Sequence, residues 1–95
     1  MSTPVSILVV EDDPTINQAV TDRLVAEGFS VHQAFDGPGA VSMFTAAAPD
    51  LVVLDVMLPG ASGFDLLRAL RAKGTVPGIM LSARNEEADR VLGLR

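Results

Sequence analysis

The chain has 95 residues, 48% of them hydrophobic, which suits one domain with a packed core and is too apolar for a disordered segment. It has no cysteine, which excludes disulfides and thiolate metal sites, and no apolar run approaches the roughly 20 residues of a membrane span. The formal net charge of −5 argues against a nucleic-acid-binding surface, because phosphate backbones are bound by clustered Lys and Arg. With no signal-peptide pattern at the N-terminus, we expect a cytoplasmic protein that does not contact the membrane.

The first predicted elements are a strand and a helix. A short, nearly continuous apolar run at residues 5–10 predicts a strand that is buried on both faces. Asp13 and Pro14 then form a typical helix start, since Asp is a good N-cap and Pro is favoured at the first helical position. The next apolar residues recur every four positions, as in an amphipathic helix, and Gly28 is placed to end that helix. These apolar residues are Ile16, Val20 and Leu24.

A weaker strand and a second helix follow. Residues 30–34 mix apolar and polar side chains, which favours a strand at an edge of the sheet. Asp36 and Gly37 predict a turn, and the apolar residues around Phe44 predict a helix that Pro49 stops.

Two further strands and two further helices complete the pattern. Apolar runs at residues 51–54 and 79–81 predict a third and a fourth strand. Between them, residues 59–63 predict a loop, and a third helix is expected to end near Lys73. Asn85 is placed to cap a fourth helix. The apolar positions that predict the third helix are Phe64, Leu67 and Leu70.

Strand-like and helix-like segments therefore alternate along the whole chain. This alternation predicts an α/β fold, a doubly wound parallel sheet with helices on both faces. The edge character of the second strand favours the flavodoxin-like strand order 2-1-3-4. In that order the first and third strands are neighbours, and ligands bind outside their carboxyl ends.

Acidic side chains stand at those carboxyl ends. Glu11, Asp12 and Asp13 follow the first strand, and Asp55 follows the third. Two carboxylates at neighbouring strand ends repel each other, and a divalent cation with hard oxygen ligands, such as Mg²⁺, removes that cost. For Asp13 the alternative is a purely structural role as the cap of the first helix.

The same crevice favours phosphoryl chemistry. A carboxylate such as that of Asp55 can attack a phosphoryl group and become an acyl phosphate. Phosphoryl transfer mainly needs positioning and neutralisation of the oxygens' charge. A cation, the Ser82 hydroxyl and a backbone N–H just after the fourth strand are candidates for that task; for Ser82 alone, a polar strand end is the alternative.

Three segments resemble the signature of the receiver domains of bacterial two-component response regulators. They are ILVVEDDP at residues 7–14, VVLDVMLPGASGFDLL at 52–67 and PGIMLSAR at 77–84. The second of them, with DRVLGL at residues 89–94, is most similar to regulators that carry a C-terminal winged-helix DNA-binding domain. The resemblance implies that residues 1–95 form one receiver domain, incomplete at its C-terminus. The fifth strand, the fifth helix and the output domain of the family are missing from this sequence.

The resemblance also implies a metal site. Asp12 corresponds to a direct Mg²⁺ ligand and Glu11 to a ligand that acts through water. Asp55 contributes its carboxylate and Met57 its backbone carbonyl. The site is expected to bind Mg²⁺, and Mn²⁺ is the second cation that it could accept.

The resemblance assigns the phosphoryl chemistry as well. Asp55 corresponds to the phospho-acceptor, Ser82 to the hydroxyl that moves toward the phosphoryl group on activation, and Ala83 to the residue whose backbone N–H binds it. Pro59 and Gly63 shape the loop after the acceptor. The Lys that pairs with the phosphoryl group in this family lies on the missing fifth strand, and Lys73 cannot replace it, since it is expected at the far end of the third helix.

The implied function is two-component signal transduction. A sensor histidine kinase transfers a phosphoryl group to Asp55, and this switches an output domain that regulates transcription. The chain is then not an enzyme, apart from catalysing its own phosphorylation and dephosphorylation. DNA is contacted only through the absent output domain, and the complete protein is expected to dimerise. Thr15, Gln18 and Asp22 on the first helix are expected to help select the kinase.

Three alternatives compete with this function. A phosphatase of the haloacid dehalogenase type needs a second Asp two residues after the nucleophile, where this chain has Met57. A nucleotide- or flavin-binding module is disfavoured because residues 11–13 would repel phosphate. A degenerate receiver that acts only as a protein-interaction module remains open: the intact acidic residues count against it, and the missing Lys counts for it.

Overall fold

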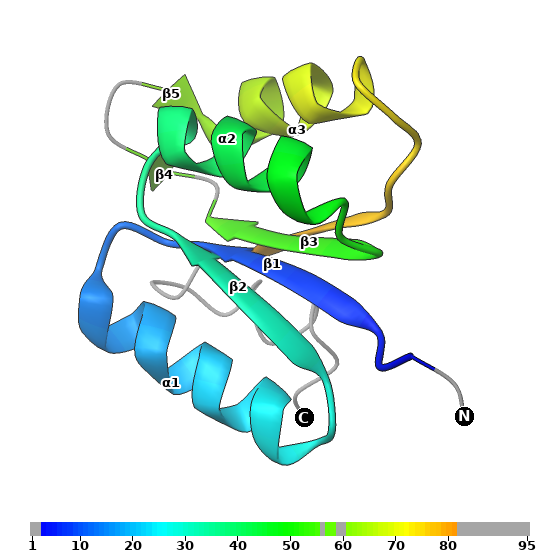
Figure 1. Ribbon diagram of the computed structural model, residues 1–95. Helices are drawn as coiled ribbons and strands as arrows, with labels where there is room; N and C mark the ends of the chain where they lie inside the picture. The colour runs from blue at the N-terminus through cyan, green and yellow to red at the C-terminus, as the bar shows by residue number, and fades with distance from the viewer. Residues whose placement is uncertain (1–2, 56, 59–60, 82–95) are drawn as a thin grey trace.

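The computed structural model describes residues 3–55, 57–58 and 61–81 (Figure 1). Its strands are β1 (Ser6–Val10), β2 (Ser30–Ala34), β3 (Leu51–Asp55), β4 (Met57–Leu58), β5 (Ala61–Ser62) and β6 (Gly78–Leu81), and its helices are α1 (Pro14–Ala26), α2 (Gly37–Ala47) and α3 (Gly63–Arg71). The predicted fourth helix, with Asn85 as its cap, lies outside the described residues. Within them, no helix combines the length and the apolar character needed to cross a bilayer.

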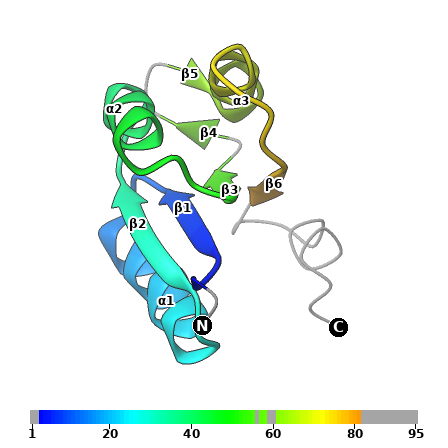
Figure 2. The same cartoon turned by 45° about the vertical axis from the view of Figure 1, so that its right-hand side comes forward.

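The main sheet is parallel, with the strand order β2-β1-β3-β6. Since β6 is the fourth strand predicted from the sequence, the flavodoxin-like order 2-1-3-4 is confirmed, and β2 lies at an edge as its composition indicated. Figure 2 shows β6 beside β3 on the side away from β1. Val10 is paired with Leu54 and with Ala34, so β1, β2 and β3 end at the same edge of the sheet.

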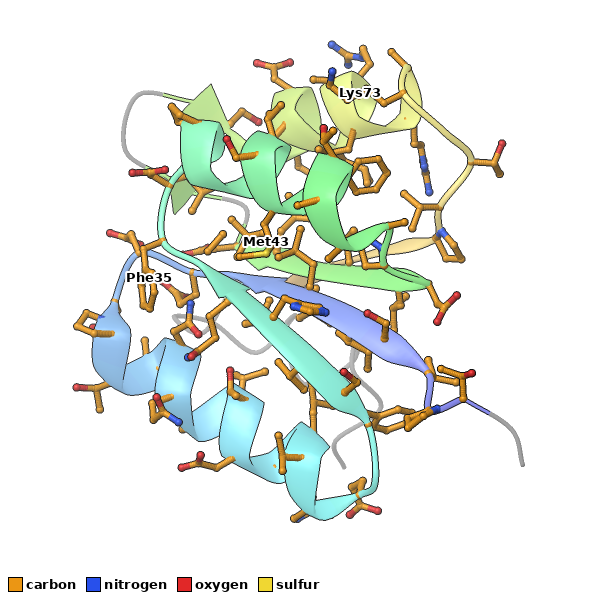
Figure 3. The ribbon with its side chains drawn as sticks, in the orientation of Figure 1. Phe35, Met43 and Lys73 are labelled. Carbon is orange, nitrogen blue, oxygen red and sulfur yellow. The ribbon has the colours of Figure 1, made fainter. Side chains whose placement is uncertain are left out.

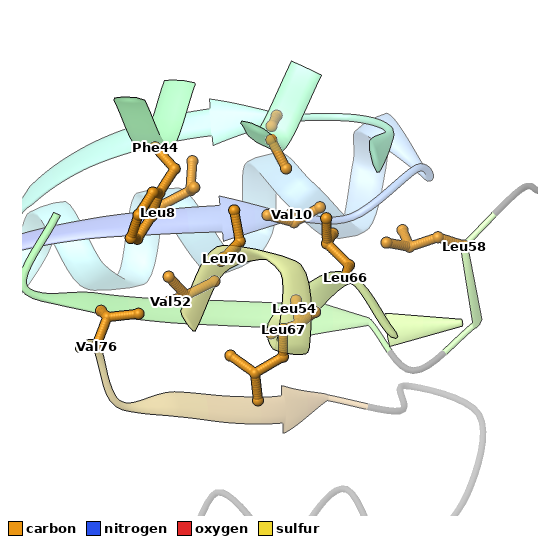
Figure 4. Close-up of a cluster of buried hydrophobic side chains, with 12 residues drawn as sticks. Leu8, Val10, Phe44, Val52, Leu54, Leu58, Leu66, Leu67, Leu70 and Val76 are labelled. Atoms are coloured by element: carbon orange, nitrogen blue, oxygen red, sulfur yellow. The ribbon is translucent and has the colours of Figure 1, made fainter. Parts of the chain in front are cut away.

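Helices cover both faces of this sheet: α1 lies on one face, and α2 and α3 lie on the other (Figure 1). Alternate residues of β1 point to opposite faces. Leu8 and Val10 belong to the larger core cluster, under α2 and α3, whereas Ile7 and Val9 pack on the side of α1. Both faces of the strand are apolar because both are covered, which explains the continuous apolar run. The larger cluster, drawn in Figure 4, contains Leu8, Val10, Ala34, Ala40, Phe44, Val52, Leu54, Leu58, Leu66, Leu67, Leu70 and Val76.

Helix α1 begins as predicted but buries a different set of residues. The Asp13 carboxylate accepts the N–H groups of Thr15 and Ile16 at 2.8 and 3.2 Å, and Pro14 is the first helical residue. The predicted apolar residues Ile16, Val20 and Leu24 are half-buried, and Val20 and Leu24 pack against the core cluster on this side of the sheet. The fully buried positions of the helix are the polar Asn17 and Thr21.

Helices α2 and α3 each differ from the prediction in one respect. Asp36 does more than mark a turn: its carboxylate caps α2 by accepting the Gly39 N–H at 2.7 Å. In α3, Phe64 is one of the apolar residues that predicted the helix, but it is 55% exposed and is not part of the buried face. The buried residues of α3 follow the spacing i, i+3, i+4 and i+7 from the first helical residue, and Phe64 lies outside that face. These buried residues are Gly63, Leu66, Leu67 and Leu70.

The loop predicted after Asp55 contains a short antiparallel ladder. Met57 pairs with Ser62 and Leu58 with Ala61, which forms the two-stranded sheet β4-β5. The Leu58 side chain is buried in the larger core cluster. The segment that follows the predicted phospho-acceptor is therefore anchored in the core within three residues of it.

Gly78, at the start of β6, is explained by its contact with α3. A Cβ atom at this position would lie 2.5 Å from Leu67 Cδ1 and 3.0 Å from Leu67 Cδ2, closer than packed carbon atoms approach. The absence of a side chain at residue 78 thus lets Leu67 fill the space between α3 and the sheet.

We predict that Gly78→Ala lowers the free energy of unfolding by about 1–3 kcal/mol, because Leu67 must leave its position. In a Leu67→Ala background the same change is expected to be neutral or stabilising, since the methyl group then fills a cavity. Gly74→Ala is the control, because nothing lies within 4 Å of a Cβ built there. Urea denaturation of the parent, of Gly78→Ala, of Leu67→Ala and of the double variant measures the coupling, and a Gly78→Ala cost that is independent of Leu67 would contradict this explanation.

Candidate phosphoryl-acceptor and metal site

Three carboxylates meet at the carboxyl edge of the sheet. Glu11 and Asp12 directly follow β1, and Asp55 is the last residue of the neighbouring strand β3. One carboxylate oxygen from each of the three residues lies within 4.8 Å of the other two. The convergence predicted from the sequence is therefore confirmed for these residues. Asp13 does not join them; it caps α1, which was the alternative role of this residue.

The three acidic residues differ in their hydrogen bonds and in how deeply they are buried. The Glu11 N–H donates to the Ala34 carbonyl at 3.1 Å, and the Glu11 carboxylate accepts the Asp13 N–H at 2.9 Å. Glu11 and Asp55 are each 1% exposed, whereas Asp12 is half-buried. The Asp12 Oδ1 atom is buried and has no hydrogen-bond partner in the described part of the chain.

The electrostatics of the cluster show the cost of bringing these groups together. The pKa of the Glu11 carboxyl is raised from 4.5 to about 7, and burial is the largest cause of this rise. The hydrogen bond from the Asp13 N–H opposes the rise, whereas hydrogen bonding with Asp12 and the charge and hydrogen bonding of Asp55 contribute to it. Without a counter-charge, the cluster therefore keeps a proton near neutral pH.

The donor set fits a small, hard divalent cation. All three groups offer carboxylate oxygens, which Mg²⁺ and Mn²⁺ prefer, and the cation would replace the retained proton as the counter-charge. The buried Asp12 Oδ1, which has no hydrogen-bond partner among the described residues, is an acceptor that such a cation would satisfy. Glu11, Asp12 and Asp55 are thus the residues that would hold the metal.

A buried asparagine beside the cluster was missed in the sequence analysis. Asn17 in α1 donates from its Nδ2 atom to the carbonyls of Glu11 and Ala34, at 3.0 Å in each case. Its Oδ1 atom accepts from Gln33 Nε2 at 2.7 Å and from Thr21 Oγ1 at 3.3 Å. The available signal was the spacing of Asn17 and Thr21, which places two polar residues on one face of the predicted helix.

The remaining predicted site residues are less fully described. Met57 lies in β4, two residues after Asp55, and nothing is described of its side chain. Gly63 is the buried first residue of α3. Pro59, Ser82 and Ala83 lie outside the described residues, so their roles stay predictions.

Lys73 is far from the acidic cluster, as expected. It lies beyond the C-terminal end of α3, at a distance from Phe35, which follows β2 at the carboxyl edge (Figure 3). It lines a cavity of about 400 Å³ beside residues that precede β3 and β6, and therefore at the amino edge of the sheet. The residues lining this cavity are Phe44, Thr45, Ala48, Pro49, Lys73, Gly74, Thr75 and Val76.

Comparison with known protein families identifies the family to which this chain belongs. The family model described as "Response regulator receiver domain" matches residues 7–95. The chain belongs to this family. It is accordingly a receiver domain of two-component signalling, and the resemblance noted in its sequence motifs is confirmed.

Individual relatives support the assignment. The sensory transduction protein RegX3 of Mycobacterium tuberculosis is 45% identical over 89 residues, which are 94% of this chain and 39% of the relative. The DNA-binding response regulator MtrA of Mycolicibacterium smegmatis is 47% identical over 88 residues, 93% of this chain and 39% of the relative. The chain thus spans about two fifths of the length of these curated relatives.

A solved structure shows the same fold. The response regulator protein TrrA of Thermotoga maritima, in complex with Mg²⁺ and BeF, superimposes with a TM-score of 0.77 at 32% sequence identity. The similarity covers 92% of this chain and 80% of TrrA.

We predict that the stability of the metal-free receiver falls as the pH rises. Because the pKa of Glu11 is higher in the folded state, its contribution is complete below pH 4.5 and is lost as the pH rises through about 7. The loss amounts to about 3 kcal/mol at most. Glu11→Gln should remove this slope, whereas Glu27→Gln, at an exposed position, should keep it. Urea denaturation of the full chain between pH 4.5 and 8 in EDTA measures the profiles; a parental slope in Glu11→Gln would contradict the assignment.

We also predict that Asp12→Asn weakens Mg²⁺ binding by more than about tenfold, because it replaces a charged ligand atom by a neutral amide oxygen. Isothermal titration of the full chain measures the dissociation constant. Asp65→Asn is the matched control, since Asp65 is exposed in the first turn of α3 and pairs with Arg68. Equal Mg²⁺ affinity in the parent and in Asp12→Asn would show that the metal binds elsewhere.

Proposed function

We propose that this receiver domain accepts a phosphoryl group on Asp55 from a sensor histidine kinase, in the presence of Mg²⁺, and thereby switches an output domain. The observation that carries the proposal is the convergence of Glu11, Asp12 and Asp55, with carboxylate oxygens within 4.8 Å of one another. A cluster of buried acids is costly to keep unless a cation or a proton offsets it. The Mg²⁺ in the complex of the related TrrA agrees with a cation at this edge.

Each of the three acids has a distinct role in this proposal. Asp12 is a direct ligand of the cation, Glu11 acts through water, and Asp55 contributes one oxygen while it serves as nucleophile. The backbone carbonyl of Met57 completes the protein's ligands. When bound, Mg²⁺ neutralises the negative charge that the phosphoryl oxygens and the carboxylates bring together.

The proposed chemical step transfers a phosphoryl group from a phosphohistidine of the kinase to Asp55. An oxygen of the Asp55 carboxylate attacks phosphorus, an O–P bond forms as the N–P bond of the kinase phosphohistidine breaks, and the electron pair leaves with the imidazole nitrogen. The product is an acyl phosphate, which water later hydrolyses back to the Asp55 carboxylate and inorganic phosphate. The Ser82 hydroxyl and the Ala83 N–H bind the phosphoryl oxygens. The chain in this way promotes only its own phosphorylation and dephosphorylation, so it acts as a signalling module.

The exposed face of α1 is part of the proposed kinase-docking surface. Gln18 Nε2 donates to Asp22 Oδ1 at 2.8 Å, which presents an ordered polar pair next to the exposed Thr15. The output is proposed to be a DNA-binding domain of the winged-helix class, in a protein that dimerises in the cytoplasm. The relative MtrA, described as a DNA-binding response regulator, supports this output.

The alternative of a degenerate receiver is less well supported. A module used only for protein interaction needs no acidic cluster, and retaining one costs stability. The burial of Glu11 and Asp55 and the raised pKa of Glu11 agree with such a cost.

We predict that the full chain gains one phosphoryl group from acetyl phosphate in the presence of Mg²⁺, and that Asp55→Asn abolishes the gain. The adduct should be removed by hydroxylamine, because acyl phosphates react with it. Intact mass and peptide mapping measure the product, with Asp65→Asn as the control that keeps it. A hydroxylamine-stable adduct on a hydroxyl residue such as Thr45, or no adduct under conditions where Mg²⁺ binds, would favour the degenerate receiver.

A further inference from the structure

The amide of Asn17 is completely buried and uses its whole hydrogen-bonding capacity. The residue is 0% exposed. Its two amide hydrogens go to the carbonyls of Glu11 and Ala34, each at 3.0 Å, and its oxygen accepts from Gln33 and Thr21. An asparagine side chain offers two donors and two acceptor lone pairs, so every position is filled.

The Asn17 amide lies at the point where the hydrogen-bonded pairing of β1 and β2 ends. The regular parallel pairing ends at Val10 and Ala34, and one further backbone bond runs from the Glu11 N–H to the Ala34 carbonyl. At this point the Asn17 Nδ2 atom adds two hydrogen bonds from the side of α1. One goes to the carbonyl of Ala34 and the other to the carbonyl of Glu11, the residue that follows β1. Helix α1 is thereby tied to both strand ends at the point where they reach the acidic cluster.

The carbonyl of Glu11 belongs to the peptide that joins Glu11 to Asp12. A peptide group is planar, so a hydrogen bond that fixes its oxygen also restricts the backbone on both sides. The directions in which the Glu11 and Asp12 side chains leave the backbone depend on this restriction. Mutual repulsion of the carboxylates would otherwise favour backbone arrangements in which they are further apart.

We infer that Asn17 is a positioning residue of the acidic site: its amide holds the Glu11–Asp12 peptide so that the carboxylates stay close enough to share one cation. The inference rests on the proposed function, since it assumes that the cluster binds a divalent cation. Asn17 carries no charge and acts only through the backbone, as the outer hydrogen-bond partners of metal ligands do.

The decisive comparison is between Asn17→Ala and Thr21→Val in the full chain. Both remove a buried polar group from the same face of α1, but the Thr21 hydroxyl donates to Asn17 Oδ1 rather than to a strand-end carbonyl. Asn17→Ala is expected to weaken Mg²⁺ binding by about tenfold or more, and Thr21→Val by less than about twofold. Isothermal titration at a temperature where thermal melting shows both variants to be folded measures this difference.

A second readout separates positioning from stability. In Asn17→Ala the Mg²⁺ concentration that half-saturates phosphorylation by acetyl phosphate should rise by the same factor, while the rate at saturating Mg²⁺ stays near that of the parent. Parental Mg²⁺ affinity in folded Asn17→Ala, or equal weakening in both variants, would overturn the inference. Absence of Mg²⁺ binding by the parent would instead overturn the proposed function and the inference together.

If Asn17→Ala does not fold, the parent chain itself supplies the test. The side-chain Nδ2 protons of Asn17 should shift during an NMR titration with Mg²⁺ along the same binding curve as the backbone N–H of Asp12. The backbone N–H of Glu27, at the other end of α1, is the internal control and should not shift. An Asn17 amide that stays as unaffected as the Glu27 N–H would overturn the inference.

Discussion

Close approach of like charges at one edge of a parallel sheet is the constraint on which this molecule depends. Glu11, Asp12 and Asp55 are brought together because β1 and β3 are paired in register and end side by side. Two of the three residues are 1% exposed, so water screens their repulsion poorly. The rest of the fold must therefore hold these strand ends firmly, and a proton or a cation must offset the charge.

The two faces of the sheet meet this demand in different ways. Under α2 and α3 the packing is apolar and tight, down to the contact in which Leu67 occupies the space left by Gly78. The same cluster takes up Leu58, so the segment just after Asp55 is tied to the core. Beneath α1 the packing is partly polar, and the amide of Asn17 joins the helix to the strand ends. Apolar packing stabilises the helices on the sheet but does not depend strongly on angle. Hydrogen bonds do depend on angle, so the fully paired Asn17 network also fixes the orientation of the groups that it joins.

The acidic cluster at the edge of the sheet bears on how a rigid domain of this kind could take part in a conformational switch. Burial raises the pKa of the Glu11 carboxyl, so the charge state of the cluster depends on what occupies it. In the proposed function, binding of a cation and addition of a phosphoryl group would both change the charge balance at these strand ends. Such changes alter a protein when an element nearby has two arrangements of similar energy. The family assignment and the acidic cluster support this proposal.

Local signals in the sequence predicted the four strands of the main sheet, the cap of α1 and the acidic residues. Apolar runs, Asp13 before Pro14 and the receiver motifs are local signals, and the strand order followed from which strand was least apolar. The tertiary structure alone decided that Phe64 is exposed, that Gly78 makes room for Leu67 and that Asn17 bridges two strand ends. Each of these depends on a partner from another element, brought near by packing and register. Periodicity can predict that a helix has a buried face, but the atoms that this face meets are fixed only when the sheet beneath it has formed.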